Sequence, residues 1–229
     1  MEIRLLDFIE GAQAAEGLTV IIDVFRAFSL EAYLMSRGTE KIYAVGSEET
    51  ARALKAEHPD YVLLGERKGK ILPGFDFGNS PSQTKDADLS GKTCIHTTSA
   101  GTQGLVNATH ASEIVTGSLV NAKAIANYIK VKNPEKVSLV GMGLAGKSKA
   151  DEDVLCERYI ESLLLDNPLD MNEELTELCL KPQSQKFFDP AHQDVFPVQD
   201  YVMCTLVDRF DFVLKVKKIT DDIFEVTKA

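Results

Sequence analysis

Charged and hydroxyl-bearing residues stand directly after several apolar runs of this chain. Asp23 ends the run LTVIIDV and Arg26 lies just beyond it, whereas Glu66, Arg67 and Lys68 follow the run YVLL. Arginine can hold a phosphate through two parallel hydrogen bonds. Carboxylates gathered at one point repel one another unless a cation lies between them, and Mg²⁺ prefers carboxylate oxygens and can bridge to phosphate. These residue types are typical of a site that handles phosphate esters.

Two further runs end in segments with the same character. The run KTCIHTT leads into a turn of hydroxyl residues and glycine, and exposed N–H groups at such a helix start bind phosphate oxygens; its residues include Thr98, Ser99, Gly101 and Thr102. The run KVSLVGM leads into GLAGKSKADED, which places Asp151, Glu152 and Asp153 in the first turn of a helix. Acids there also stabilise the helix dipole, and a hydroxyl-rich turn also caps a helix, so neither segment is specific alone.

The segment GERKGKILPGFDFGNSP, residues 65–81, is rich in glycine, proline and charge. We expect it to be an irregular loop after a strand. Its apolar residues Ile71, Leu72, Phe75 and Phe77 are costly to leave in water, so the loop should pack onto the protein and hold its charges in defined positions.

The elements that must position these residues alternate between strand and helix. Strands are expected at 18–24, 41–45, 61–65, 92–98, 113–117 and 136–142, with helices at 26–37, from Ser47, at 100–108, 121–132 and 151–165. This alternation predicts one α/β domain over 1–229, a three-layer α/β/α fold with a mostly parallel sheet. Residues 165–208 should be mainly helical. Two closing strands near the C-terminus should form an antiparallel pair at an edge or in a small extra sheet. Because ligands bind at the carboxyl ends of parallel strands, the polar residues should converge at one edge.

Composition excludes several classes of protein. The formal net charge is −10, which argues against general binding to nucleic acid or to an anionic membrane. No apolar run approaches the roughly 20 residues of a membrane span, and no export signal is evident, so we expect a cytoplasmic protein with reduced, buried cysteines. The four histidines form no zinc-binding pattern.

The segment GMGLAGKS, Gly141–Ser148, matches two nucleotide-binding patterns. The dinucleotide pattern lacks its acid at the end of a second strand. The P-loop pattern would place Lys147 on the phosphates and Ser148 on Mg²⁺, but the acids that follow oppose a triphosphate electrostatically. A P-loop NTPase or kinase therefore stands as an alternative function.

Together the motifs resemble the 2-phosphosulfolactate phosphatase (ComB-like) family of the coenzyme M pathway. The matching stretches are VIIDVFRAFS, GERKGKILPGFDFGNSP, TTSAGTQGL and GLAGKSKADEDVLCERYI, which occur in the family's order. The resemblance implies a Mg²⁺-dependent phosphatase with an α/β fold of its own type, a small phosphorylated acid as substrate, and a homodimer. Phe28, Leu30 and Glu31 depart from a hydroxyl-rich run in the family, and Ala100 replaces its asparagine.

On these grounds we assign roles as hypotheses. The residues expected to act in catalysis are Asp23, Arg26, Glu66, Arg67 and Asp76. The metal would be bound from among Asp23, Glu66, Asp76, Glu152 and Asp153. The substrate would be bound by Lys68, Asn79, Ser80, Thr98, Ser99, Gly101, Thr102 and Lys147, with Lys68 or Lys147 meeting a second anionic group. The nucleophile is a water molecule or an aspartate, and the absence of a D-x-D-x-[TV] pattern favours water. A non-catalytic anion-binding protein remains a further alternative.

Overall fold

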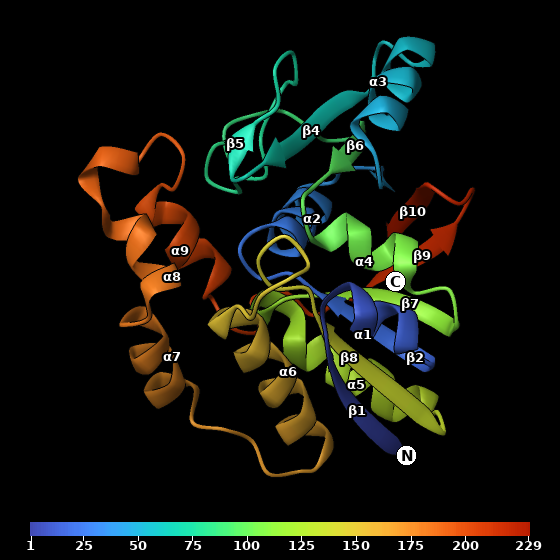
Figure 1. Cartoon of the computed structure of the whole chain (residues 1–229), viewed down its shortest axis with the longest axis vertical. Helices are drawn as coiled ribbons and strands as arrows, with labels where there is room; N and C mark the ends of the chain where they lie inside the picture. The colour runs from blue at the N-terminus through green and yellow to red at the C-terminus, as the bar shows by residue number, and fades with distance from the viewer.

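A ten-stranded sheet forms the centre of the computed structural model, which describes residues 1–229 (Figure 1). The strand order is β1-β8-β2-β7-β9-β10-β3-β6-β4-β5. The strands are β1 (Glu2–Asp7), β2 (Gly17–Ile22), β3 (Lys41–Val45), β4 (Val62–Arg67), β5 (Lys70–Ile71), β6 (Thr93–Thr97), β7 (Ala111–Gly117), β8 (Lys136–Gly141), β9 (Leu214–Lys218) and β10 (Ile223–Lys228).

The sheet contains two parallel parts, β1-β8-β2-β7 and β3-β6-β4. The β9–β10 hairpin lies between them and pairs antiparallel with β7 on one side and with β3 on the other. The two parallel parts therefore run in opposite directions within the sheet. Their carboxyl ends turn toward each other around α2 (Ala27–Ser36) and α4 (Gly101–Asn107) (Figure 1). The polar strand ends meet between these two parts rather than along one edge of a single parallel sheet.

Helices cover both faces of the sheet, which gives the predicted three-layer α/β/α arrangement. One apolar core joins α1, α2 and α4 to both parallel parts, a second packs α5 and α6 on β2, β7 and β8, and a third holds α3 against β3, β4 and β6. The helices are α1 (Phe8–Ala14), α2 (Ala27–Ser36), α3 (Glu48–Glu57), α4 (Gly101–Asn107), α5 (Ala122–Lys132), α6 (Asp151–Leu164), α7 (Met171–Cys179), α8 (Pro182–Gln185) and α9 (Val198–Cys204), with 3-10 turns at Leu119–Asn121, Lys186–Phe188 and Pro190–His192.

The strand–helix alternation is confirmed from β2 to α6, and Ser47 accepts a hydrogen bond from the Thr50 amide at the start of α3, as its capping role requires. The position of the closing hairpin was predicted wrongly, because β9 and β10 lie inside the sheet. Their buried side chains, including Leu214, Phe224 and Val226, show which face packs inward but do not specify which strands lie beside them. Strand β1 and helix α1 were not predicted, because β1 is only partly buried and mixes charged with apolar residues, and α1 has only seven residues. That the whole chain is one domain stays a prediction.

The segment 65–81 is more regular than expected at its start. Strand β4 continues through Arg67 and turns back into β5, and Lys68 and Gly69 both have positive φ, as a tight two-residue hairpin turn requires. Leu72 and Phe75 are buried against β3, β4 and β6, which confirms that the loop packs down, whereas Ile71 is 51% exposed.

Residues 165–208 are mainly helical, as predicted, and α7, α8 and α9 stand together on one side of the molecule (Figure 1). No helix has the length and apolarity needed to span a bilayer. Cys94, Cys156 and Cys204 are buried thiols, Cys179 is partly buried, and none forms a disulfide.

Candidate functional site

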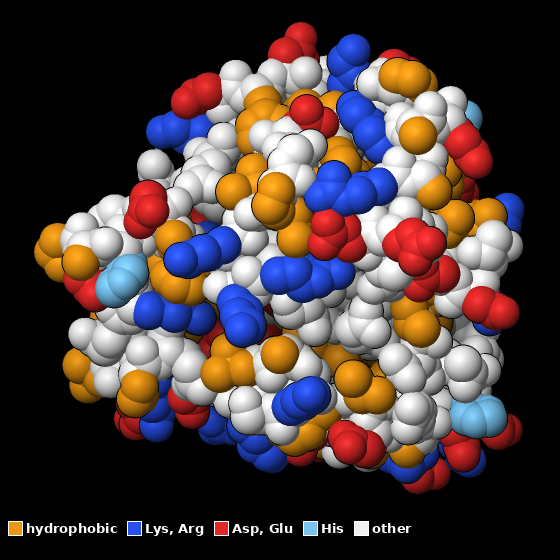
Figure 2. Space-filling model, turned by 45° about the horizontal axis from the view of Figure 1, so that its top comes forward, with side chains coloured by type: hydrophobic (Ala, Val, Ile, Leu, Met, Phe, Trp, Pro, Cys, Tyr) orange, Lys and Arg blue, Asp and Glu red, His pale blue; other side chains and the backbone are white.

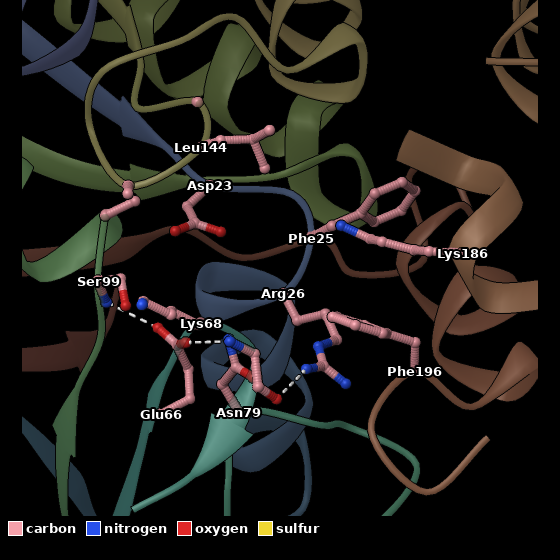
Figure 3. A pocket seen from close by; sticks show the side chains of 14 residues that line it. Asp23, Phe25, Arg26, Glu66, Lys68, Asn79, Ser99, Leu144, Lys186 and Phe196 are labelled. Atoms are coloured by element: carbon pink, nitrogen blue, oxygen red, sulfur yellow. Dashed lines mark hydrogen bonds between the residues drawn. The ribbon is translucent and has the colours of Figure 1, made fainter. Parts of the chain in front are cut away.

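A cavity of about 290 Å³ opens where the carboxyl ends of the two parallel parts face each other. It receives residues from the β2–α2 turn, the β4–β5 hairpin, the β6–α4 turn, the loop after β8 and the C-terminal helical segment (Figure 3). The lining residues are Asp23, Phe25, Arg26, Glu66, Lys68, Gly69, Asn79, Ser99, Ala100, Gly143, Leu144, Ala145, Lys186 and Phe196.

Asp23 is buried in the cavity wall directly after β2. One carboxylate oxygen accepts the Ala27 amide at 3.1 Å and the other accepts the Gly101 amide at 2.9 Å, so Asp23 ties the start of α2 to the start of α4. Burial, with a smaller contribution from the nearby Glu66, raises the pKa of the Asp23 carboxyl to about 6, against the opposing effect of the two backbone donors. The negative charge of Asp23 is therefore costly near neutral pH, and a bound cation would relieve that cost.

Glu66 lies across the cavity from Asp23 on β4 (Figure 3). Its two oxygens accept the amides of Ser99 at 2.7 Å and Gly69 at 2.6 Å. Thus the amides of the β6–α4 turn that we expected to hold phosphate already hold carboxylates. Thr98 and Thr102 bond to each other within the same turn and are buried, which makes them structural residues of the turn.

Two further carboxylates lie behind the cavity in the first turn of α6. Asp153 accepts the amides of Val24 and Gly143, both at 2.8 Å, and so fixes the loop after β8 to the loop after β2. Glu152 is buried, and its Oε2 has no hydrogen-bond partner. Burial, with a smaller contribution from the charge of Asp23, raises the pKa of Glu152 to about 7 and also raises the pKa of Asp153. Asp23, Glu152 and Asp153 are therefore three buried acids close to one another, and Glu66 is a fourth buried acid across the cavity.

This arrangement argues against a P-loop at residues 141–148. Helix α6 begins only at Asp151, after a turn closed by the Leu144–Ser148 bridge. The inner side of the loop binds the Asp153 carboxylate, where a P-loop would bind phosphate. Lys147 is exposed and does not line the cavity.

Arg26 is buried and turns toward the C-terminal segment. Its NH1 donates to Asp200 at 2.7 Å and to the Val195 carbonyl at 2.8 Å, and its NH2 donates to the Gly69 carbonyl at 3.1 Å. Asp200 is fully buried and also accepts from Ser80 and from the Ser82 amide. The predicted phosphate ligand Arg26 thus also joins β2, the hairpin and α9.

The sequence predictions for the site separate into two groups. The cavity brings together Asp23, Arg26, Glu66, Lys68, Asn79 and Ser99. Outside its lining lie Arg67, Asp76, Ser80, Thr98, Gly101, Thr102, Lys147, Glu152 and Asp153. Asp76 is the clearest departure, because its carboxylate accepts the Leu63 amide at 2.8 Å and lies 3.6 Å from Lys55, so it fastens the loop to β4. Arg67 donates to the Glu66 carbonyl and to the Thr97 hydroxyl.

The C-terminal segment supplies lining residues that the sequence did not reveal. Lys186 reaches into the cavity and Phe196 packs beside it, with the Arg26 guanidinium 5.2 Å from the Phe196 ring centre (Figure 3). Burial lowers the pKa of Lys186, although the neighbouring acids oppose this change. Lys186 stands in the short sequence KFF and does not follow a predicted strand. The two phenylalanines beside it were therefore the only indication in the sequence of its burial near a site.

Three of the residues that depart from the resemblance are packed in the interior, whereas the fourth, Ala100, lines the cavity. Phe28, Leu30 and Glu31 are buried in α2, and Glu31 lies 2.9 Å from the His96 Nδ1. Their side chains support the site from behind and do not line the cavity.

The fit of a metal ion can be judged from the carboxylates. No group of three His, Cys, Asp or Glu side chains is arranged to bind a metal ion by itself. Mg²⁺ is commonly held by one or two carboxylates together with water and substrate phosphate, so such a group is not required. The three buried acids, with one unpartnered oxygen on Glu152, are compatible with a cation held in this way.

The cavity lining carries three basic side chains, Arg26, Lys68 and Lys186, beside two acidic ones, Asp23 and Glu66. Although the net charge is −10, Lys and Arg side chains lie close together over part of one face of the molecule (Figure 2). A small anion can therefore find basic side chains on an acidic protein.

Comparison with known proteins identifies the family. Residues 5–218 match the family model described as 2-phosphosulpholactate phosphatase. The chain belongs to this family. A relative from Bacillus subtilis (strain 168), named probable 2-phosphosulfolactate phosphatase, is 33% identical over 208 residues, 90% of this chain and 89% of the relative. Relatives with the same name from Caldanaerobacter subterraneus (30% identity, 88% of each chain) and Carboxydothermus hydrogenoformans (39% identity, 72% of this chain and 68% of the relative) also match. The protein is thus an enzyme of a phosphoric monoester hydrolase family.

Proposed function

We propose that this protein hydrolyses 2-phosphosulfolactate to 3-sulfolactate and phosphate, in a coenzyme M-type pathway, with Mg²⁺ as cofactor. The relatives named above support the substrate. The observation that carries the proposal for this chain is the cavity itself, where the buried Asp23 and Glu66 face Lys68 and Lys186. Such a site can bind a small anionic ester and a cation together.

Within this proposal, Asp23 is the cavity carboxylate that binds Mg²⁺, and Glu152 is the second candidate because its Oε2 is buried without a partner. Mg²⁺, when bound, would neutralise charge on the phosphoryl group and on the leaving oxygen. The two backbone amides on Asp23 and the two on Glu66 hold these carboxylates in fixed orientations before substrate arrives. Fixed polar groups of this kind stabilise developing charge without reorganisation.

Lys68, at the tip of the β4–β5 hairpin, is placed to meet a second acidic group of the substrate. It lines the cavity and forms no ion pair with any carboxylate of the protein. Asn79 lies nearby with its Oδ1 buried and unpartnered, so it can accept a hydrogen bond from a substrate hydroxyl or a bound water. The cytoplasmic location and the homodimer stay predictions.

The test is release of inorganic phosphate from a panel of small phosphoacids, with ATP included, in Mg²⁺ and in EDTA. We expect release from 2-phosphosulfolactate that EDTA stops and added Mg²⁺ restores. Asp23→Asn should abolish this release while keeping the circular dichroism spectrum, and Asp60→Asn, which changes an exposed acid, should not affect it.

Each alternative predicts a different result. Phosphate release that persists in EDTA would overturn the assignment of a metal cofactor but would still support a phosphatase. ATP hydrolysis removed by Lys147→Ala would instead support the P-loop alternative. Stabilisation by phosphorylated or sulfonated acids with no turnover on any substrate would support an anion-binding protein.

A further inference from the structure

Lys186, like Lys68, is a cationic group of the cavity that no carboxylate of the protein neutralises at close range. Lys186 takes part in none of the ion pairs of this structure, so no carboxylate oxygen lies within 4 Å of its Nζ. Arg26, by contrast, is paired with Asp200. Its nearest characterised partners are the rings of Phe196, 5.0 Å away, and Phe187, 5.2 Å away. A partly buried ammonium with only aromatic faces beside it is poorly compensated for the water it has lost.

The position of Lys186 is fixed by the packing around it. Phe187, the next residue, is fully buried and makes edge contacts with Phe25 and Phe196 at ring distances of 5.0 and 5.7 Å. Phe196 in turn lies over Gly69, where a Cβ would come within 2.6 Å of its ring. The C-terminal segment is thus locked against the hairpin and the β2–α2 turn, and Lys186 reaches the cavity from a rigid support.

The charges facing Lys186 show which part of an anion it would meet. Glu152, Asp23 and Asp153 lie near enough to favour its charge, and Arg26 opposes it. Figure 3 shows the Lys186 amine pointing toward the Asp23 side, with Lys68 beside Glu66 and Ser99 in another part of the site. Asp23 and Asp153 already accept two backbone amides each, and in the proposed function the acidic side also holds Mg²⁺.

We propose that Lys186 is a phosphate-binding residue, which donates its ammonium to the phosphoryl group of the substrate while Lys68 meets the second acid. This inference rests on the proposed function for the identity of the ester. It gives the C-terminal segment a direct part in the reaction, since the cavity would otherwise present no free cation to the phosphoryl group beside Asp23.

The experiment compares Lys186→Met, Lys186→Arg and Lys181→Ala with the parent enzyme. Methionine keeps an unbranched stem that can pack on both rings and removes the charge, arginine keeps the charge, and Lys181→Ala removes an exposed charge from the same segment. Two readouts are measured: binding of inorganic phosphate by calorimetry in Mg²⁺, and kcat/KM on 2-phosphosulfolactate and on p-nitrophenyl phosphate, which lacks a second acid.

We expect Lys186→Met to weaken phosphate binding about 10- to 100-fold, as loss of one hydrogen bond to a charged group does. The kcat/KM values on both esters should fall by a similar factor, Lys186→Arg should recover part of the loss, and Lys181→Ala should match the parent. Thermal unfolding of each variant identifies any loss that comes from misfolding, and recovery by arginine identifies the charge as the cause.

Other outcomes overturn the assignment. If Lys186→Met lowers kcat/KM only on 2-phosphosulfolactate, Lys186 meets the carboxylate or sulfonate and not the phosphoryl group. If phosphate binding and both kcat/KM values are unchanged while the parent remains an active phosphatase, Lys186 has no role in binding and the proposed function stands. If the parent binds phosphate through Lys186 but hydrolyses no ester, the proposed function is wrong, whereas the assignment of Lys186 as a phosphate-binding residue is supported.

Discussion

Glu157 of α6 can be used to measure how much a buried carboxylate lowers the free energy of unfolding of this protein. Its side chain is buried, and one oxygen accepts the Gly141 amide at the end of β8. Burial, with a smaller contribution from Asp7, raises the pKa of Glu157 to about 8 from an ordinary 4.5, against the opposing effects of the Gly141 amide and Lys149. The change to test is Glu157→Gln, which keeps the size of the side chain and an oxygen that can accept the same amide.

The expected sign follows from the two protonation states. Below pH 4.5 the carboxyl is protonated in both the folded and the unfolded chain, so it adds no penalty. As the pH rises from 4.5 to 8, the unfolded chain ionises first and the free energy of unfolding falls; above pH 8 the penalty is constant. At pH 7 the penalty is about 3 kcal/mol, at about 1.4 kcal/mol for each pH unit above the ordinary pKa. Glutamine removes this penalty, so the variant should be more stable than the parent at pH 7 and above.

The assay is thermal unfolding of the parent and of Glu157→Gln between pH 5 and pH 8.5. For a chain of this length, about 3 kcal/mol corresponds to an increase in Tm of roughly 6–12 °C at pH 7. The increase should shrink as the pH approaches 5. Glu177→Gln, which changes an exposed acid of α7, is the control and should show no such dependence. A difference between Glu157→Gln and parent that stays constant with pH would refute the reasoning, because it would show that ionisation of this carboxyl is not what costs stability.

Three further predictions concern the supports of the site. Asp200→Ala should lower the free energy of unfolding by about 3–5 kcal/mol in urea titrations, because it leaves the buried Arg26 charge unpaired; a loss below about 1 kcal/mol would contradict this view of the ion pair. Lys147→Ala should change kcat/KM less than twofold, since Lys147 is exposed outside the cavity. A large loss of activity would show that Lys147, in the loop 141–148, takes part in the reaction. Gly104→Ala should destabilise the fold by about 1–3 kcal/mol through overpacking, because the new Cβ would lie 2.6 Å from the Met142 sulfur; unchanged stability would show that the core can yield there.

Much of the fold could be predicted because its signals are local. Dense β-branched runs such as LTVIIDV, followed by helical segments, specify strands and helices through side-chain shape and through burial of apolar faces. The motif GERKG placed Glu66 and Lys68 after a strand, and the structure brings both to the cavity with Asp23. Family resemblance carried by these motifs is confirmed by the match over residues 5–218.

Placement across the sheet could not be predicted in this way. The alternation of apolar residues in β9 and β10 indicates a buried face but leaves the neighbouring strands open, and their insertion between β7 and β3 reverses the direction of one parallel part. Asp76 stands in a matching motif but lies outside the cavity, because its carboxylate accepts a hydrogen bond from the Leu63 amide.

The sequence by itself therefore determined the element types, the acids and bases at the strand ends, and the family. Only the tertiary structure decided which of these residues face one another. Contacts between residues far apart in the chain, such as Arg26 with Asp200 and Phe25 with Phe187, leave no periodic signal, because they depend on the packing of the whole chain. Those contacts bring Lys186 into the cavity, and they are the reason that the C-terminal segment belongs to the site.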